Sequence, residues 1–258
     1  MSGIEKLEKT TMKKVIGVVS GKGSVGKSTT SVLLARALKD HGYTVGILDA
    51  DITGPSIPRL LGVEGQAGES NGEKILPLVD EQGIELISVN MFLKDEDEPV
   101  IWRGPLLANA LKQFYSDTDW GPLDYLIVDF PPGTGDVNLT GFQQLPLDGI
   151  VIVATPQDFV SMIVTKSVKM AVKTDIPVLG LVENMGAMVC PHCNKEFSLF
   201  AQSGTADAAK NMGLPLLSRM AWRAELAQRG ALLWDSLPED LKEAARNLAK
   251  ETTTALNA

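Results

Sequence analysis

The chain has 258 residues and a formal net charge of −8, and 44% of its residues are hydrophobic. This length suits one large α/β domain or two small ones, and the excess of acids argues against nucleic acid as the main partner. No apolar run approaches the roughly 18 residues that span a bilayer, and the N-terminal segment lacks the apolar core of a secretory signal. We therefore expect a cytoplasmic protein that binds neither nucleic acid nor membrane.

Apolar, β-branched runs recur along the chain, and several of the stretches between them have helical spacing. Such runs suit strands covered on both faces, so the alternation predicts an α/β fold with a doubly wound, mostly parallel sheet flanked by helices. In such sheets ligands bind at the carboxyl ends of the strands. The expected strands are residues 15–19, 44–48, 84–89, 125–128, 150–154 and 178–182, and the expected helices are 27–42, 105–115 and 161–174.

The remaining segments complete the expected organisation. Residues 62–74 are rich in glycine and polar side chains and predict an exposed hairpin or loop, and the acidic run 93–100 predicts a solvated loop. Residues 237–258 predict a capped amphipathic helix that ends in a polar tail. We expect residues 1–11 to be a flexible leader and residues 12–258 to form a single domain.

A glycine-rich stretch, GKGSVGKS at residues 21–28, fits the phosphate-binding pattern G-x-x-x-x-G-K-[ST] between an expected strand and an expected helix. Its glycines let backbone N–H groups surround phosphate oxygens, and the start of the helix adds positive charge. Lys27 is expected to bridge the β- and γ-phosphates, and the Ser28 hydroxyl to ligate Mg²⁺. The expected nucleotide-binding residues here are Gly21, Lys22, Gly23, Ser24, Val25, Gly26, Lys27, Ser28 and Thr29.

The geometry of this loop does not require a lysine at position 22. Residues 21–29 resemble the deviant Walker A motif, KGGxGK[ST], of the MinD/ParA/nitrogenase-iron-protein class of ATPases. The resemblance implies that Lys22 reaches across a homodimer to the ATP of the other subunit, much as an arginine finger acts in trans. A solvent-exposed lysine near an anionic ligand is the alternative. Ser24 replaces the usual glycine, so the loop either avoids a positive φ there or is strained.

Acidic residues close two of the expected strands, where Mg-ATP chemistry needs carboxylates. Asp129 follows four apolar residues and looks like a Walker B carboxylate that holds Mg²⁺ through water. In the class resembled, the second acid of a D-x-D segment positions the attacking water; here that acid is Asp51, with Asp49 in support. Asp136 belongs either to a second switch or to a loop cap. The expected catalytic residues are thus Lys22, Lys27 and Asp51, and the expected magnesium ligands are Ser28, Asp51 and Asp129.

Two further residues are expected at the nucleotide. Gly133, in a Pro-Pro-Gly turn, is placed to offer its N–H to the γ-phosphate. Asn184 follows the expected strand 178–182, where an amide pairs with the adenine edge in related ATPases. A buried asparagine with satisfied hydrogen bonds is the alternative for Asn184.

The two cysteines, Cys190 and Cys193, form one CxxC motif. Two intervening residues let both sulfurs bind one metal, but zinc and iron–sulfur clusters want about four ligands. A two-fold homodimer brings two such pairs together and supplies four thiolates. Thiolates suit zinc and iron–sulfur alike, so residue type leaves the metal open, and a redox dithiol is a further alternative.

Taken together, the blocks GKGSVGKST, DADITGPSIPRLLG, VIWRGP, DWGPLDYLIVDFPPGTGD, VCPHC and PVLGLVENM resemble the Mrp/ApbC family of iron–sulfur cluster carrier ATPases, over residues 14–230. The resemblance implies a homodimer that binds a bridging [4Fe-4S] cluster at the paired CxxC and transfers it to apo iron–sulfur proteins, with slow ATP hydrolysis. The alternatives are a MinD/ParA-like spatial-positioning ATPase, which leaves the cysteines unexplained, and a zinc-bridged dimeric client-targeting ATPase.

Overall fold

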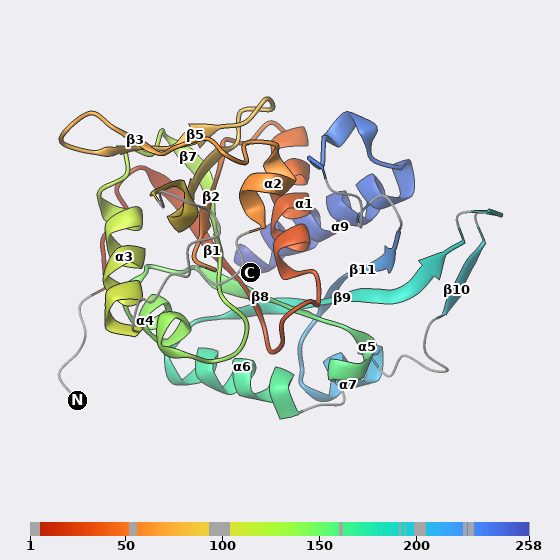
Figure 1. Cartoon of the computed structure of the whole chain (residues 1–258). Helices are drawn as coiled ribbons and strands as arrows, with labels where there is room; N and C mark the ends of the chain where they lie inside the picture. The colour runs from red at the N-terminus through yellow and green to blue at the C-terminus, as the bar shows by residue number, and fades with distance from the viewer. Residues whose placement is uncertain are drawn as a thin grey trace.

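Nine strands form one mostly parallel sheet in the part of the chain described by this computed structural model, in the order β10-β9-β8-β1-β7-β2-β6-β5 with β11 beside β9 (Figure 1). The described residues are 6–51, 56–92, 104–159, 162–190, 192–193, 195–198, 205–223, 226 and 230–257. The acidic run 93–100 and most of the VIWRGP block lie outside them. The strands of this sheet are β1 (Met12–Ser20), β2 (Val45–Asp49), β5 (Leu78–Val79), β6 (Glu85–Ser88), β7 (Leu123–Asp129), β8 (Gly149–Ala154), β9 (Val178–Val189), β10 (Glu196–Ser198) and β11 (Leu216–Trp222).

All six expected strands form, which confirms the mostly parallel sheet. The edge strands β5 and β10 are antiparallel to β6 and β9. Strand β11 was not expected, because Ser218 and Arg219 interrupt its apolar run. The parallel register of β2 and β7 sets Asp49 directly beside Asp129. The carboxyl edge of the sheet therefore carries two adjacent carboxylates.

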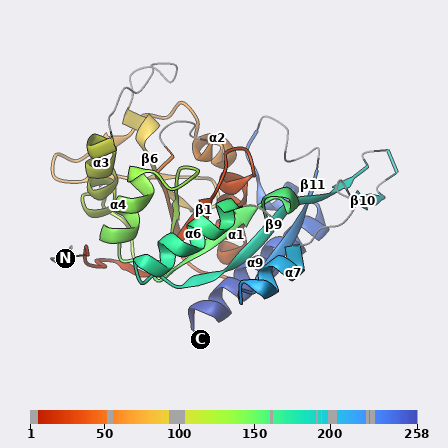
Figure 2. The same ribbon diagram turned by 90° about the horizontal axis from the view of Figure 1, so that it is seen from below.

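Helices cover both faces of the sheet (Figures 1 and 2). Helices α1, α2 and α9 lie on one face and α5, α6 and α7 on the other, while α3 packs against α4. The expected helices are confirmed within one or two residues, which is the usual uncertainty of helix ends. The bounds are α1 (Lys27–Asp40), α2 (Ile57–Leu61), α3 (Gly104–Ser116), α4 (Asp136–Gln144), α5 (Pro156–Phe159), α6 (Met162–Lys173), α7 (Thr205–Asn211) and α9 (Glu239–Leu256), with 3₁₀ turns η1 (Val89–Phe92) and η2 (Trp234–Ser236).

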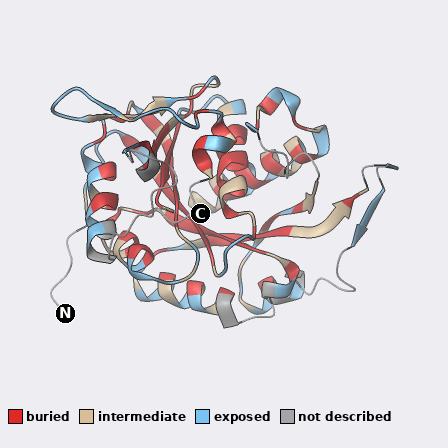
Figure 3. Ribbon diagram, viewed as in Figure 1, coloured by how far each residue is buried: buried red, intermediate tan, exposed pale blue. Residues whose placement is uncertain are grey.

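The core follows the sheet and the inner sides of these helices (Figure 3). Every residue of β8 is buried, as are the last six residues of β1. Fully burying one such aliphatic side chain is worth about 1.5–3 kcal/mol, so these central strands contribute strongly to the stability of the fold. The expected exposed hairpin is the pair β3 (Glu69–Ser70) and β4 (Ile75–Leu76), which lies outside this sheet.

The structure adds detail to what was expected of the C-terminal helix and of the N-terminal leader. Helix α9 begins after Pro238 without a side-chain hydrogen bond to cap it, and it continues to Leu256, so residues 250–256 are helical rather than a tail. The described part of the expected leader contacts the domain: the Leu7 N–H donates to the Gln144 carbonyl oxygen at 2.7 Å, and Lys9 pairs with Asp148 at 2.6 Å. None of the helices within the described ranges has the length and hydropathy needed to cross a bilayer.

Candidate nucleotide site and cysteine hairpin

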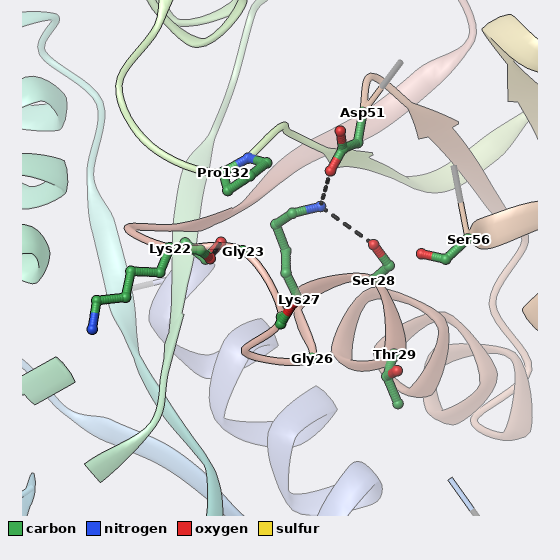
Figure 4. A pocket seen from close by; sticks show the side chains of 11 residues that line it. Lys22, Gly23, Gly26, Lys27, Ser28, Thr29, Asp51, Ser56 and Pro132 are labelled. Atoms are coloured by element: carbon green, nitrogen blue, oxygen red, sulfur yellow. Dashed lines mark hydrogen bonds and ion pairs between the residues drawn. The ribbon is translucent and has the colours of Figure 1, made fainter. Parts of the chain in front are cut away.

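The loop between β1 and α1 borders a pocket of about 250 Å³ at the carboxyl edge of the sheet (Figure 4). The tip of the loop, Lys22 to Ser24, is exposed, whereas Lys27 is buried. Seven of the nine loop residues expected to bind the nucleotide therefore line one cavity, and Gly21 and Val25 are the two that do not. The described residues that line it are Ser20, Lys22, Gly23, Ser24, Gly26, Lys27, Ser28, Thr29, Asp51, Ser56 and Pro132.

Two residues of this loop adopt left-handed backbone conformations. Gly26 has φ +82°, and a Cβ atom there would lie 2.1 Å from Nδ2 of Asn184, so only glycine fits. Ser24 has φ +63°, a conformation that costs free energy for any residue with a side chain. Of the two possibilities for Ser24, the structure adopts the strained one.

Lys27 and Asp129 form the buried centre of the pocket. Nζ of Lys27 donates to Oδ2 of Asp129 at 2.7 Å, and the Ser28 hydroxyl donates to the same oxygen at 2.6 Å. The Ser31 hydroxyl donates to Oδ1 of Asp129 at 2.7 Å. Three donors thus hold a carboxylate that is 0% exposed, as a buried charge requires.

Asp51 and Asp49 lie on the other side of Lys27. Oδ2 of Asp51 is 3.6 Å from Nζ of Lys27, and the Asp51 N–H donates to Oδ1 of Asp49 at 3.1 Å, so Asp49 supports Asp51 (Figure 4). Burial and the neighbouring Asp129 raise the pKa of Asp49 to about 8. This raised pKa favours a protonated Asp49 side chain at neutral pH.

The two loop lysines point in different directions. Lys27 extends into the pocket toward Asp51, whereas the Lys22 side chain extends away from it (Figure 4). Lys22 is exposed while Lys27 is almost fully buried. In this orientation Lys22 could reach a nucleotide bound to another subunit. To contact phosphates bound in its own subunit, the Lys22 side chain would have to turn toward the pocket.

The N–H of Gly133 already has a partner within the protein, so its expected contact with the γ-phosphate stays a prediction. Its N–H donates to the Ser20 carbonyl oxygen at 2.8 Å, because the turn at φ +90° directs the N–H back to the end of β1. The nearby amide of Asn138 holds this turn by donating to the Gly133 and Pro131 carbonyl oxygens. Asp136 is exposed in the first turn of α4, where a carboxylate interacts favourably with the helix dipole.

Asn184 lies behind the loop, on β9. Its Nδ2 donates to the Val25 carbonyl oxygen at 2.9 Å, and its Oδ1 accepts the Met185 N–H at 3.0 Å. The side chain is buried, so the amide joins the phosphate loop to the strand. These contacts match the alternative of a buried asparagine whose hydrogen bonds are satisfied within the protein. Contact of Asn184 with adenine stays a prediction.

The cysteines lie where β9 turns into β10. This cysteine hairpin, residues 186–198, projects from the body of the molecule in both views (Figures 1 and 2). Cys190 is half-buried and Cys193 is exposed, and both are free thiols. Hydrogen bonds from the His192 and Cys193 backbone, followed by one from the Cys193 side chain, lower the pKa of Cys190. Backbone N–H groups that stabilise a thiolate prepare it to bind a metal.

The cysteine pair is not part of a larger metal-ligand cluster among the described residues. Within the described residues, no cluster of three or more His, Cys, Asp and Glu side chains is placed to hold a metal ion. Two thiolates at the end of a projecting hairpin form half of a four-ligand site. Any four-thiolate centre there needs a second pair from another molecule.

Sequence reasoning missed two hydroxyl groups of the nucleotide site. Ser31 holds Asp129, and the Ser88 hydroxyl donates to Oδ2 of Asp49 at 3.0 Å. Ser31 lies four residues after Lys27 on α1, so helical spacing places it on the same side and was the available signal. Nothing local to Ser88 predicts its contact, which arises because β6 pairs with β2.

Comparison with known proteins gives the family. Residues 11–254 match the model of the ParA family described as NUBPL iron-transfer P-loop NTPase. The iron–sulfur cluster carrier protein of Clostridium perfringens is 47% identical over 84% of this chain and 78% of its own, and that of Methanocaldococcus jannaschii is 48% identical over 81% and 72%.

Solved structures agree in fold. The nucleotide-binding protein from Archaeoglobus fulgidus in complex with ADP is 34% identical, with a TM-score of 0.75 over 93% of this chain and 89% of its own. The cell division ATPase MinD of Pyrococcus furiosus, 19% identical with a TM-score of 0.61 over 93% and 98%, shows the same fold. The chain therefore belongs to the NUBPL iron-transfer family of P-loop NTPases.

Proposed function

We propose that this protein is an ATP-dependent iron–sulfur cluster carrier. Two copies bind one [4Fe-4S] cluster between their cysteine hairpins and deliver it to apo iron–sulfur proteins. The observation that carries the proposal is the cysteine hairpin itself. It holds two free thiols at a projecting turn, the half-buried Cys190 with a lowered pKa and the exposed Cys193, in a chain whose relatives are named iron–sulfur cluster carriers. A cargo that must leave again is best held at an exposed place.

The incomplete ligand set supports a homodimer. A single copy supplies two thiolates, and a two-fold axis through the centre of the cluster doubles them to four. Because the hairpin projects from the body, two copies can bring these turns together without their cores colliding (Figure 2). An exposed cluster held by four thiolates is also accessible to the thiolates of an acceptor.

The donor set beside the P-loop fits ATP with Mg²⁺. Ser28, Asp51 and Asp129 supply the hard oxygen ligands that Mg²⁺ prefers, directly or through water. When bound, Mg²⁺ would neutralise charge on the β- and γ-phosphates. Lys27 then exchanges part of its pairing with Asp129 for the phosphates, and Asp51 accepts a hydrogen bond from the attacking water.

Lys22 completes the proposed site from the other subunit. Its side chain points away from its own pocket, as a residue that acts in trans requires (Figure 4). A cation added at the γ-phosphate stabilises the charge that develops there during hydrolysis. Dimer closure would in this way couple ATP turnover to the pairing of the cysteine hairpins.

A zinc-bridged client-targeting ATPase is the second candidate, since the same four thiolates suit Zn²⁺. A MinD/ParA-like positioning ATPase is less well supported: the fold is shared, but α9 buries Leu241 and Leu248 in the core, so this apolar face is not available to a membrane. A net charge of −8 does not favour binding to DNA either.

Anaerobic reconstitution with iron and sulfide tests the proposal, with visible absorption, metal analysis and transfer to an apo-ferredoxin as readouts. A brown dimer that restores the absorption of the acceptor, and does so faster with MgATP, supports a carrier. A colourless dimer that retains zinc under the same conditions supports the second candidate and contradicts the first.

A further inference from the structure

We infer that Asn184 is a positioning residue that couples nucleotide binding at the P-loop to the orientation of the cysteine hairpin. The inference rests on the proposed function and names how one site of that function would regulate the other. It concerns a single chain and so differs from coupling through dimer closure.

Asn184 joins the two sites directly. Its Nδ2 donates to the Val25 carbonyl oxygen within the P-loop at 2.9 Å, and its Oδ1 accepts the N–H of the next residue, Met185, at 3.0 Å. The Nδ2 atom also lies against Gly26, so close that no side chain fits there. If the loop backbone shifts when phosphate binds, the Asn184 side-chain amide must therefore move with it or lose its hydrogen bond to Val25.

The strands that pair with β9 change immediately after Asn184. Its pairing with β8 ends at Glu183, and the β10 pairing begins only at Ala187. On its other side, the register with β11 shifts between Met220, opposite Asn184, and Trp222, opposite Met188, so that two steps on β11 correspond to four on β9. Residues 185–187 thus form a bulge between the main sheet and the cysteine hairpin, and a bulge is where a strand can bend.

Two unfavourable features lie in the bulge or next to it. Met185 has φ +59°, a left-handed conformation that is costly for a residue with a long side chain. Glu183 is 4% exposed, and no donor in the described ranges reaches its Oε2 atom, while Oε1 is 3.8 Å from Nε of Arg219. A buried carboxylate oxygen without a partner marks a place where an alternative arrangement can compete.

Space is available for such a bend. A pocket of about 270 Å³ lies between the base of the cysteine hairpin and β11, and Glu183, Gly186, Phe197 and Arg219 are among the residues that line it. Closing the hairpin over this pocket would bring β10 toward Arg219. In this proposal the bulge has two arrangements, and Asn184 is the contact through which the P-loop selects one of them.

Amide hydrogen exchange on the reduced, cluster-free full chain tests this coupling. ADP is the ligand, at a protein concentration where light scattering gives a monomer, so neither dimer closure nor a cluster contributes. We expect ADP to protect the P-loop and to change exchange across residues 186–198 at least threefold in the wild type. In Asn184→Ala, ADP should still protect the P-loop but leave the hairpin unchanged. Asn71→Ala, in the exposed β3–β4 hairpin, is the matched control and should behave as the wild type.

Met185→Gly is a second variant, which tests the coupling if Asn184→Ala fails to bind ADP or to fold. It keeps the contacts of Asn184 and removes the cost of the left-handed backbone conformation at position 185. We expect P-loop protection without the hairpin response. A wild-type hairpin that ignores ADP, or variants that both keep the full response, would overturn the coupling. Because the readout includes no iron and no acceptor, a failure of cluster transfer would leave this result standing.

Discussion

The nucleotide pocket and the cysteine hairpin solve opposite problems. In the pocket, charges are buried and each is paired: Asp129 accepts hydrogen bonds from Lys27, Ser28 and Ser31. At the hairpin, one thiol is half-buried and the other exposed, and one copy supplies only two of the four thiolates that such a site needs. Under the proposed function, this difference means that the nucleotide site is pre-organised for one repeated ligand, whereas the cysteine site is left open for a cargo that passes between proteins.

Removing a cysteine should have the largest effect. We expect Cys193→Ala to lose essentially all reconstituted iron, since a dimer would retain only two of four thiolates, while its unfolding free energy changes by less than about 0.5 kcal/mol, as is usual for an exposed residue. Lys195→Ala, on the same turn, is the control and should bind iron as the wild type does. Normal iron content in the cysteine variant would place the metal elsewhere.

Removing charge from the pocket centre comes next. Asp129→Asn should lower MgATP turnover by about 100-fold. Asparagine has nearly the shape of aspartate, but it lacks the negative charge that pairs with Lys27 and that would hold the water shell of Mg²⁺. Asp119→Asn, an exposed acid paired with Lys74, should change turnover little. Steady-state phosphate release measures both, and equal rates for the two variants would refute the role of Asp129.

The packing of the loop against β9 can be separated from its backbone conformation with two glycines. Gly26→Ala should lower the unfolding free energy by about 3 kcal/mol, because it combines a positive φ with a clash against Asn184. Gly133→Ala has the positive φ but nothing within 4 Å of the new Cβ, so it should cost only about 1 kcal/mol. Urea denaturation gives both values; similar losses would mean that the contact with Asn184 is loose.

Asp49 gives the stability of the pocket a pH dependence. The folded chain holds this proton to a pKa of about 8, while the unfolded chain releases it near about 3.9. The proton therefore stabilises the fold below pH 4, and this contribution is lost as pH rises toward 8. Relative to Asp49→Asn, the wild type should lose stability as the pH rises over that range. Parallel stability curves for the two proteins would contradict the assignment.

The smallest expected effect is at the loop tip. Ser24→Gly relieves the left-handed conformation, but glycine also gains freedom in the unfolded chain, so the net stabilisation should be about 0.5 kcal/mol. Thermal unfolding would show a rise of a degree or two. A fall in Tm would mean that the Ser24 side chain makes a contact that outweighs the strain.

Much of the nucleotide site could be predicted because a local motif encodes it. The sequence from Gly21 to Ser28 specifies strand, turn and helix, and the apolar run before Asp129 places that acid at the correct edge of the sheet. What could not be predicted depends on tertiary geometry. The Gly133 N–H is used by Ser20, and Asn184 reaches the P-loop from a strand 158 positions beyond Gly26.

For the cysteine hairpin, too, the sequence predicts the chemistry of the residues but not their geometry. Its CxxC motif predicts thiolate ligation from two residues alone, but the projection of the turn and the bulge before it follow from how β9 pairs with β10 and β11. No periodicity in residues 185–187 indicates a bend. The left-handed Met185 is visible only in the folded backbone.

The most direct test of the shared cluster is to measure iron content and molecular mass together on one anaerobically reconstituted sample. We predict a dimer that carries about two iron atoms per chain, with Cys193→Ala monomeric and free of iron under the same conditions. A monomer that carries a full cluster, or a dimer whose mass and iron content are unchanged by the Cys193 substitution, would contradict the account.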